Sequence, residues 1–276
     1  SNADTLVFTK GEPLPHSTID NITTHIFQLE DETIFYHRFF ASPQTIYVIF
    51  EGKEIEAALP VDNCNFGVFG NALYFEAREK LYKAHFSDSS ITVSFLRDQL
   101  PDEEVLNLAL CSRIRDGKKV VYRFIDDPDV DGVEIGVDDE KLEGAKLSGL
   151  VSGKLLYSRV NSELQEPTVR TLSQAATLIE LPCSHSARFI TDDASPFVYL
   201  TDWSNLITLD LERLAFLQPL ALQIPVSVLG GIRDGILTLL SGTGEEAERK
   251  WLARARLPDA YVCKQEVQRA VGEEAQ

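Results

Sequence analysis

The chain has 276 residues, 44% hydrophobic and 25% charged, which is typical of a soluble globular protein with one large domain or two ordinary ones. Its net charge of −17 opposes binding to nucleic acid or to an anionic membrane, and it favours basic protein partners and cations. No apolar run approaches the ~18 residues of a membrane-spanning helix. The longest candidate, Leu214 to Leu229, is broken by Pro219 and Pro225.

The start of the chain and its cysteines bear on the compartment. Asp4 to Phe8 does not resemble a signal peptide, which predicts a cytoplasmic protein. The four cysteines are far apart and form no C-x-x-C pair. This spacing argues against a zinc knuckle or a disulfide framework and predicts reduced, mostly buried thiols.

The first 60 residues predict an antiparallel β-meander with one wet face. Glu30-Asp31-Glu32 is the turn of a hairpin in which His25 and His37 can face each other. Such a pair is more typical of packing than of a metal site. The expected strands are Leu6–Phe8, His25–Leu29, Thr33–Phe40, Thr45–Phe50 and Lys53–Ala57.

Helices are expected between strands in the middle of the chain. Leu73, Ala77, Leu81 and Ala84 recur at helical spacing, which predicts a helix near 71–86. Strands are expected on either side of a second helix, at Ile91–Leu96 and Lys119–Ile125.

That second helix is expected to begin at Pro101, because the acids Asp102-Glu103-Glu104 suit the positive start of a helix. Asp116-Gly117 would end it. Cys111 would then lie buried and inert on its inner face.

The rest of the chain predicts further strands and helices, with no internal repeat. Helices are expected at 167–179, within 206–217, at 244–256 and at 260–271. The expected strands are Leu155–Val160, Ala187–Thr191, Phe197–Leu200, Pro225–Leu229 and Ile236–Leu240.

The predicted fold class is α+β (mixed α/β): an N-terminal antiparallel β-meander, then interleaved helices and strands, then C-terminal helices. The charged stretch Asp138–Gly149 suggests a boundary between an N-terminal α+β domain, 4–145, and a C-terminal α/β domain, 146–276. A single domain is the alternative.

The densest acid cluster resembles the opening of a calcium-binding loop. Asp127, Asp129 and Asp131 occupy alternate positions, so a tight turn could bring their oxygens onto one hard cation. Val133 would add its carbonyl oxygen, and Asp138 stands at position twelve. These five residues are the candidate metal ligands, with Ca²⁺ as the only candidate cofactor.

Several features favour a solvated hairpin turn instead. A strand precedes the loop where a helix is usual, Pro128 stiffens it, and Glu134 replaces an apolar residue. Asp138 is shorter than the bidentate Glu that the motif prefers. We expect the hairpin to form without Asp138 reaching the turn.

Other patterns are weaker. Gly242-x-Gly244-x-x-Ala247 follows a strand, but Glu246 would repel a pyrophosphate, so a capping box between Thr243 and Glu246 is preferred. No cofactor-binding residues are therefore assigned. Cysteine–histidine chemistry has candidates in Cys183-Ser184-His185 and Cys64, which lack the surroundings of a known nucleophile.

Three function classes remain open. The leading prediction is a soluble, non-catalytic interaction or accessory protein that docks to a protein partner. The first alternative is a calcium-binding protein that uses the loop Asp127–Asp138. The second is an enzyme whose site is assembled from dispersed residues.

Overall fold

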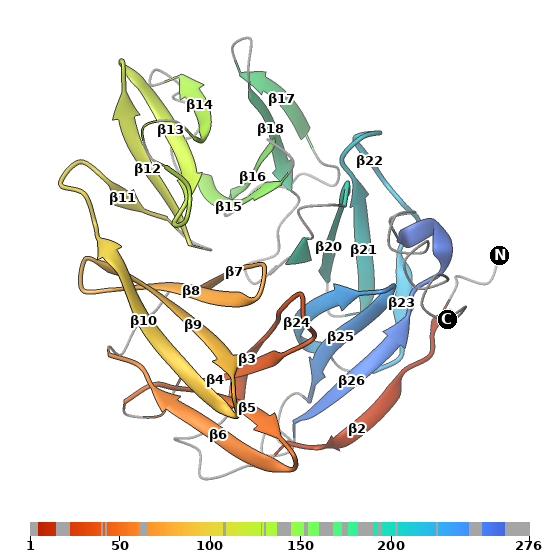
Figure 1. The fold of residues 1–276 in the computed structure, drawn as a ribbon. Coiled ribbons are helices and arrows are strands. Elements are labelled where there is room, and N and C mark those ends of the chain that lie inside the picture. Colours follow the sequence, from red (N-terminus) through yellow and green to blue (C-terminus); the bar gives the residue numbers. More distant parts are fainter. Residues whose placement is uncertain are drawn as a thin grey trace, which may run out of the picture. The chain divides into compact units, whose positions relative to one another are not determined.

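The computed structural model is built from β-strands (Figure 1). Compact packing divides the chain into two units. The first comprises Ser1–Asp62, Phe86–Ile91 and Ala187–Gln276, and the second Asn63–His85 and Thr92–Ser186. The structure describes residues 5–14, 23–39, 41, 43–60, 66–106, 109–127, 129, 131–136, 145–151, 154–159, 168–172, 176–181, 190–191, 195–201, 204–224, 226–242 and 250–262.

The first unit contains three sheets, with strand orders β3-β4-β5-β6, β2-β26-β25-β24 and β1-β23-β21-β20-β19, where β22 also pairs with β21. Their strands are β1 Thr5–Leu6, β2 Thr9–Pro13, β3 Thr23–Gln28, β4 Ile34–Arg38, β5 Thr45–Phe50, β6 Lys53–Ala58, β19 Ile190–Thr191, β20 Phe197–Thr201, β21 Asn205–Asp210, β22 Ala215–Phe216, β23 Leu220–Leu222, β24 Val226–Arg233, β25 Ile236–Ser241 and β26 Trp251–Arg256.

The second unit holds the orders β11-β12-β13-β14 and β15-β16-β18-β17, and most of β10-β9-β8-β7. Their strands are β7 Phe66–Phe69, β8 Ala72–Ala77, β9 Lys80–Ser87, β10 Ser90–Asp98, β11 Glu104–Val105, β12 Leu110–Arg115, β13 Lys118–Arg123, β14 Val133–Gly136, β15 Ala145–Val151, β16 Lys154–Arg159, β17 Thr168–Leu172 and β18 Ala176–Leu181.

Three of the described sheets, β3–β6, β7–β10 and β11–β14, have four strands that neighbour one another in chain order, as in the blades of a β-propeller. In the sheet β15-β16-β18-β17 the last two strands are exchanged, and β16 pairs in parallel with β18. The sheet β2-β26-β25-β24 also departs from chain order, because its fourth strand comes from the start of the chain. Just before it, β1 pairs in parallel with β23. The N-terminal segment therefore ties two sheets of the first unit together.

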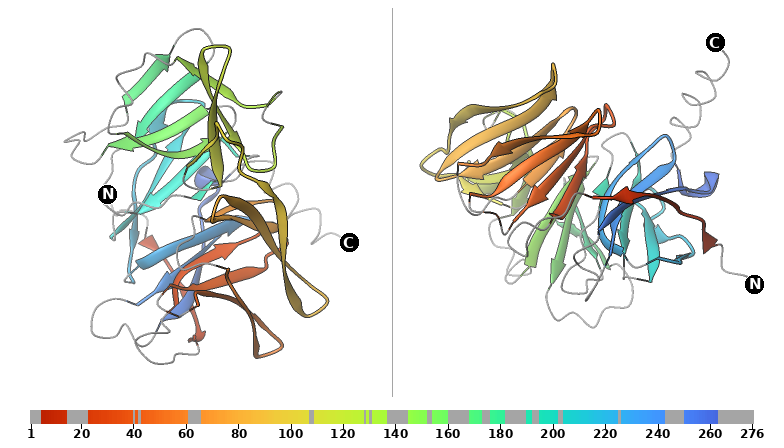
Figure 2. Two further views of the ribbon diagram at one scale, coloured as in Figure 1. Left: turned by 90° about the vertical axis from the view of Figure 1, so that its left-hand side faces the viewer. Right: turned by 90° about the horizontal axis from the view of Figure 1, so that it is seen from below.

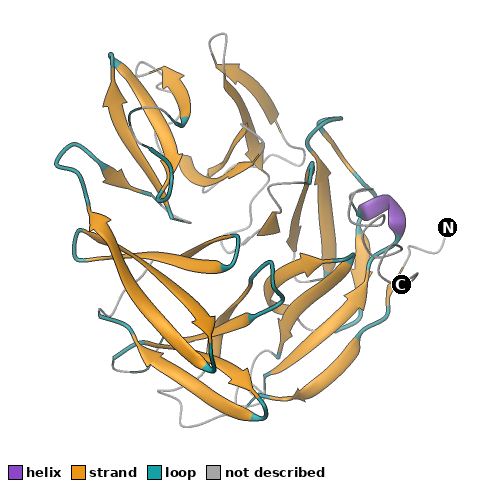
Figure 3. Cartoon of the chain, in the orientation of Figure 1, coloured by secondary structure: helices purple, strands orange, loops and turns teal. Residues whose placement is uncertain are grey.

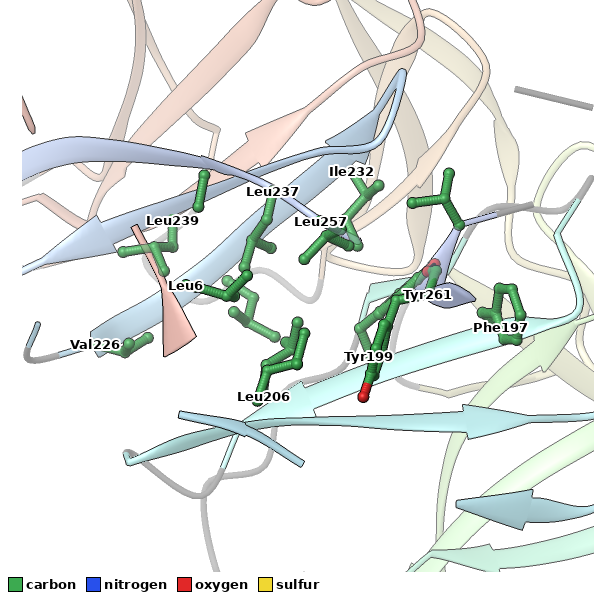
Figure 4. Packing of buried hydrophobic residues seen from close by; sticks show 14 of the residues in the cluster. Leu6, Phe197, Tyr199, Leu206, Val226, Ile232, Leu237, Leu239, Leu257 and Tyr261 are labelled. Carbon is green, nitrogen blue, oxygen red and sulfur yellow. Dashed lines mark hydrogen bonds between the residues drawn. The ribbon is translucent and has the colours of Figure 1, made fainter. Parts of the chain in front are cut away.

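A hydrophobic core fills the space between these two sheets of the first unit (Figure 4). Leu237 and Leu239 of β25 point toward Leu206 of β21 and Tyr199 of β20. Leu6 of β1 is 3% exposed within this cluster. Since burial of one such side chain contributes about 2 kcal/mol, the N-terminal segment stabilises the fold through its side chains as well as its pairing.

The double glycine of β24 lies where a neighbouring strand comes very close. A Cβ at Gly230 would stand 2.6 Å from Cδ1 of Ile26, and one at Gly231 would stand 2.7 Å from Cβ of Gln28. Both neighbours belong to β3, so the glycines let β24 and β3 approach each other.

Two-residue turns close several of the hairpins. Glu51-Gly52, Asp116-Gly117 and Asp234-Gly235 have positive φ at both residues, from 50° to 76°. The pairs Arg78-Glu79 and Asp88-Ser89 show the same conformation. These are the dihedrals of type I′ turns, whose twist matches that of antiparallel strands.

The prediction of an α+β fold was wrong, because the described chain forms strands throughout (Figure 3). Within the residues that the structure describes, the only helical segment is a short 3-10 turn, Asp259–Tyr261. The helix expected near 71–86 is the hairpin β8–β9. Leu73 and Ala84 are direct cross-strand partners. Leu73, Ala77 and Ala84 share one face of this hairpin, whereas Leu81, opposite Glu76, lies on the other face. Because all four are buried, their positions imitate helical spacing.

The other helix predictions fail for related reasons. The helix expected from Pro101 is β11 and β12, and Asp116-Gly117 is a hairpin turn rather than a helix end. Strands also replace the helices expected at 167–179, within 206–217 and over the described end of 244–256. Residues 263–276, which include most of the last expected helix, lie outside the described residues.

The predicted strands fared better. Those expected at 25–29, 33–40, 45–50 and 53–57 correspond to β3–β6, and those at 197–200 and 236–240 to β20 and β25. The division into domains 4–145 and 146–276 remains a prediction. No helix in the described part of the chain is long and apolar enough to cross a membrane.

Candidate functional site

A buried arginine, Arg38, lies at the end of β4 in the first unit, with a side chain only 5% exposed. Alternation along the strands places it on the face that also carries Tyr47, Glu54 and Glu56. Its guanidinium contacts both carboxylate oxygens of Glu54 and donates to Glu56 at 3.3 Å. The guanidinium carbon lies 4.0 Å from the centre of the Tyr47 ring. These contacts hold β4 to β6 across β5.

Two tyrosines continue this face into the core. Tyr36 stacks on Tyr47 with ring centroids 4.8 Å apart, and the Tyr47 hydroxyl lies 2.7 Å from Oγ1 of Thr23. Burial raises the pKa of both phenols. Both phenols therefore stay neutral at physiological pH and supply no phenolate base.

The opposite face of the same hairpin carries the predicted histidine pair, which the structure confirms. His25 and His37 are cross-strand partners, and their rings stack with centroids 5.8 Å apart. Nε2 of His37 lies 3.2 Å from Oε1 of Gln44, and Nδ1 of His25 lies 3.1 Å from Oγ1 of Thr24. The pair thus forms part of a packed hydrogen-bonded layer.

A buried carboxylate organises a second polar cluster, in the second unit. Arg97 donates to Glu103 through two nitrogens at 2.6 and 2.8 Å, the Tyr122 hydroxyl donates at 2.6 Å, and the Leu100 amide at 3.0 Å. Burial opposes the charged form, but these donors outweigh it and lower the pKa of Glu103 to about 2. The carboxylate is therefore ionised, and its hydrogen bonds join β10 and β13 to the segment before β11.

Cys111 lies beside this carboxylate. It is buried, as predicted, but on β12 rather than on a helix. Burial raises the pKa of its thiol, and the nearby Glu103 carboxylate raises it further. A thiol in such surroundings is a poor nucleophile, because only the thiolate attacks.

The acidic loop uses its carboxylates to hold its own backbone. Asp127 accepts from the amide of Asp129 at 2.9 Å, and Asp131 accepts from the amide of Asp127 at 2.9 Å. Asp129 pairs with Arg113 at 3.1 Å. Val133 begins β14, and Asp138 lies outside the described residues.

Two of the three described loop carboxylates thus bind backbone amides, and the third binds an arginine, as in a turn stabilised by its own side chains. Among the residues that the structure describes, no three or more His, Cys, Asp or Glu side chains form a group able to hold a metal ion. Several other sequence candidates fall in the parts not described: Cys64, Cys183, His185, and the Thr243–Glu246 cap.

Sequence reasoning missed both buried clusters. Glu103 was interpreted as a helix-start acid, whereas its donors Arg97 and Tyr122 come from β10 and β13. A usable signal existed for the other cluster. Arg38 ends an otherwise apolar and aromatic strand, while Glu54 and Glu56 alternate on a later one.

Acidic hairpin turns gather at one end of the first unit. In a four-stranded meander the first and third turns lie at the same end, so Glu30, Asp31 and Glu51 share an end of the sheet β3–β6. Nε of Arg233 donates to the carbonyl of Leu29 at 3.0 Å, which holds the turn at Asp234 beside the first of these turns. The four exposed acids Glu30, Asp31, Glu51 and Asp234 are called the acidic turns below.

The described sheets define an all-β protein with propeller-like blades. No family model and no curated protein matches the chain. Among solved structures it is similar to the Pan2 WD40 domain of Neurospora crassa, at 9% identity and a TM-score of 0.45, over 93% of this chain and 98% of that one.

Two other solved structures show a similar degree of likeness. One is the glutaminyl cyclase of Myxococcus xanthus, at 13% identity and a TM-score of 0.40, over 94% of this chain and 100% of that one. The other is the Cps50 (Swd1) β-propeller domain of Myceliophteria thermophila, at 9% identity and a TM-score of 0.43, over 91% of this chain and 100% of that one. At these scores the likeness carries no information about ligands or activity.

Proposed function

We propose that this chain is a non-catalytic interaction protein whose acidic turns dock a basic segment of a protein partner. The observation that carries the proposal is the contrast between its buried and exposed charges. Arg38 and Glu103 are buried and paired inside sheets. The acidic turns instead project from hairpin ends into solvent.

Charge supports the nature of the partner. With a net charge of −17, the protein attracts basic surfaces and repels nucleic acid. Exposed carboxylates at a shared end of two sheets concentrate this field, which speeds association with Lys- and Arg-rich segments. Neither the calcium alternative nor the dispersed-site enzyme is favoured by a contact of the described residues.

The test compares two variants of equal charge. In the first, Glu30, Asp31, Glu51 and Asp234 become Gln or Asn. In the control, four exposed acids elsewhere change in the same way: Glu79, Asp102, Asp116 and Glu212. The probe is a fluorescent oligolysine peptide, measured by anisotropy at several salt concentrations.

We expect the first variant to bind about tenfold more weakly, because each exposed pair contributes up to ~1 kcal/mol, while the control loses much less. Added salt should remove the difference. Equal losses in both variants would show that only net charge matters, and the proposed docking surface would then be wrong.

A further inference from the structure

The outermost strands of the sheets differ in how well their open edges are protected. Natural sheets block unwanted pairing with short edge strands, charged residues, proline or bulges. In the described part of the chain, β6, β14 and β17 have six residues or fewer and each carries a charge, and β2 contains Lys10, Glu12 and Pro13.

Strand β10 has none of these protections over most of its length. It has nine residues and pairs only with β9 in the described sheet, where it is the terminal strand (Figures 1 and 2). Its first seven residues, Ser90–Leu96, are uncharged, and Ile91, Thr92 and Val93 are β-branched. An edge of this kind exposes a row of backbone donors and acceptors that only another extended chain can match.

An aromatic anchor stands beside this edge. Phe95 is 52% exposed, an unusual state for a large apolar side chain on a strand. Its ring meets Tyr82 edge to face, with centroids 6.0 Å apart, and Tyr82 stacks on Phe75 at 5.5 Å. Since the rings beneath hold Phe95 in place, an incoming apolar side chain would find a preformed contact.

We propose that Thr92–Asp98 of β10 binds an extended segment of a protein partner, which adds a strand to the sheet by β-augmentation. Apolar side chains at alternate positions of that segment pack on Phe95. A Lys or Arg near its end faces the exposed carboxylate of Asp98, in keeping with the net charge of −17. The inference rests on the proposed function only in that the occupant is a protein segment.

The experiment uses the full chain and a fluorescent peptide in which valine alternates with threonine between terminal lysines. The edge variants are Phe95→Lys and Thr92→Lys. The matched control is Ile125→Lys, since Ile125 is 48% exposed but lies in a turn after β13 and not on a strand. Circular dichroism melts establish that each variant is folded.

We expect both edge variants to weaken binding at least about tenfold, as for the loss of an interface anchor, and the control to bind like the native chain. Hydrogen exchange should slow at alternate amides of Thr92–Asp98 when the peptide is added. The acidic-turn variant should bind this peptide normally, so that failure of one proposal can be told from failure of the other.

Three results would overturn the inference. The first is equal binding by the edge variants and the control. The second is slow exchange of the Thr92–Asp98 amides before the peptide is added, because the edge would then be covered by the chain itself. The third is a dimer in sedimentation that Phe95→Lys dissociates, because the occupant would then be a second copy of the chain.

Discussion

Two acidic regions border the sheet β11–β14, and they differ in burial and in partners. Glu103, just before β11, has a side chain that is 0% exposed and bound by Arg97 and Tyr122. The turn from Asp127 to Asp131 holds more carboxylates but lies at the surface, where they bind its own amides and Arg113. How much a carboxylate contributes to stability therefore depends on its burial and on donors from distant strands, rather than on the density of acids along the chain.

The largest expected effect is the loss of Glu103. In Glu103→Gln the amide group must face donors that need an anion, and the charge of Arg97 loses its partner. We expect a loss of about 3 kcal/mol in the free energy of unfolding. Chemical denaturation of this variant and of Glu104→Gln provides the comparison, since Glu104 is exposed and contacts the Lys119 ammonium and the Ser112 hydroxyl. Similar losses in both would contradict the assigned difference.

The stability of the fold should also depend on pH through the ionisation of Glu103. Because the pKa of Glu103 falls to about 2 in the folded chain, its ionised form stabilises the fold fully above the usual Glu range. This contribution, at most about 3 kcal/mol, is lost as the pH falls from roughly 4.5 toward 2. Melting curves across this window should show a steeper decline for the native chain than for Glu103→Gln. Parallel curves would contradict the prediction.

The rate at which Cys111 reacts with a thiol reagent tests the packing around Glu103, because the two side chains lie side by side. A thiol reagent should label it slowly in the folded chain, because its side chain is buried and its pKa is raised. Glu103→Gln should speed the labelling by loosening the strands around it. The labelled residue is identified by peptide mapping, since three other cysteines are present. Rapid labelling of the native chain at Cys111 would place the thiol at the surface.

A substitution in the acidic turn should have a much smaller effect. Asp131→Asn keeps an oxygen that can accept from the amide of Asp127 and relieves repulsion between neighbouring carboxylates. We expect a change in stability within about 0.5 kcal/mol. A loss as large as that of Glu103→Gln, measured by the same denaturation, would mean that the turn is as important to the fold as the buried cluster.

Particular residues show how far the sequence could lead. The hairpin of His25 and His37 was predictable, because alternation and a short acidic turn mark it locally. The hairpin β8–β9 was not recognised, because the turn at Arg78-Glu79 lacks glycine and buried residues on both faces fall at helical spacing. Asp116-Gly117 was a usable hairpin signal, since the pair adopts the type I′ conformation that this dipeptide favours.

The buried clusters could not be predicted from local patterns. Glu103 meets its donors only after β10 and β13 have found their places, and Arg38 reaches Glu54 only across an intervening strand. The repeated sheet was hidden for a similar reason. Three of the described sheets share a strand order and an antiparallel pairing, but no repeated residues.

The structure assigns the carboxylates of Asp127, Asp129 and Asp131 to holding their own turn rather than a metal ion. A calorimetric titration of the native chain with calcium tests this assignment most directly. We expect no binding heat up to millimolar calcium, because the carboxylates of Asp127 and Asp131 bind backbone amides and that of Asp129 binds Arg113. A micromolar site that disappears in Asp129→Asn would contradict the assignment and make cation binding the leading function.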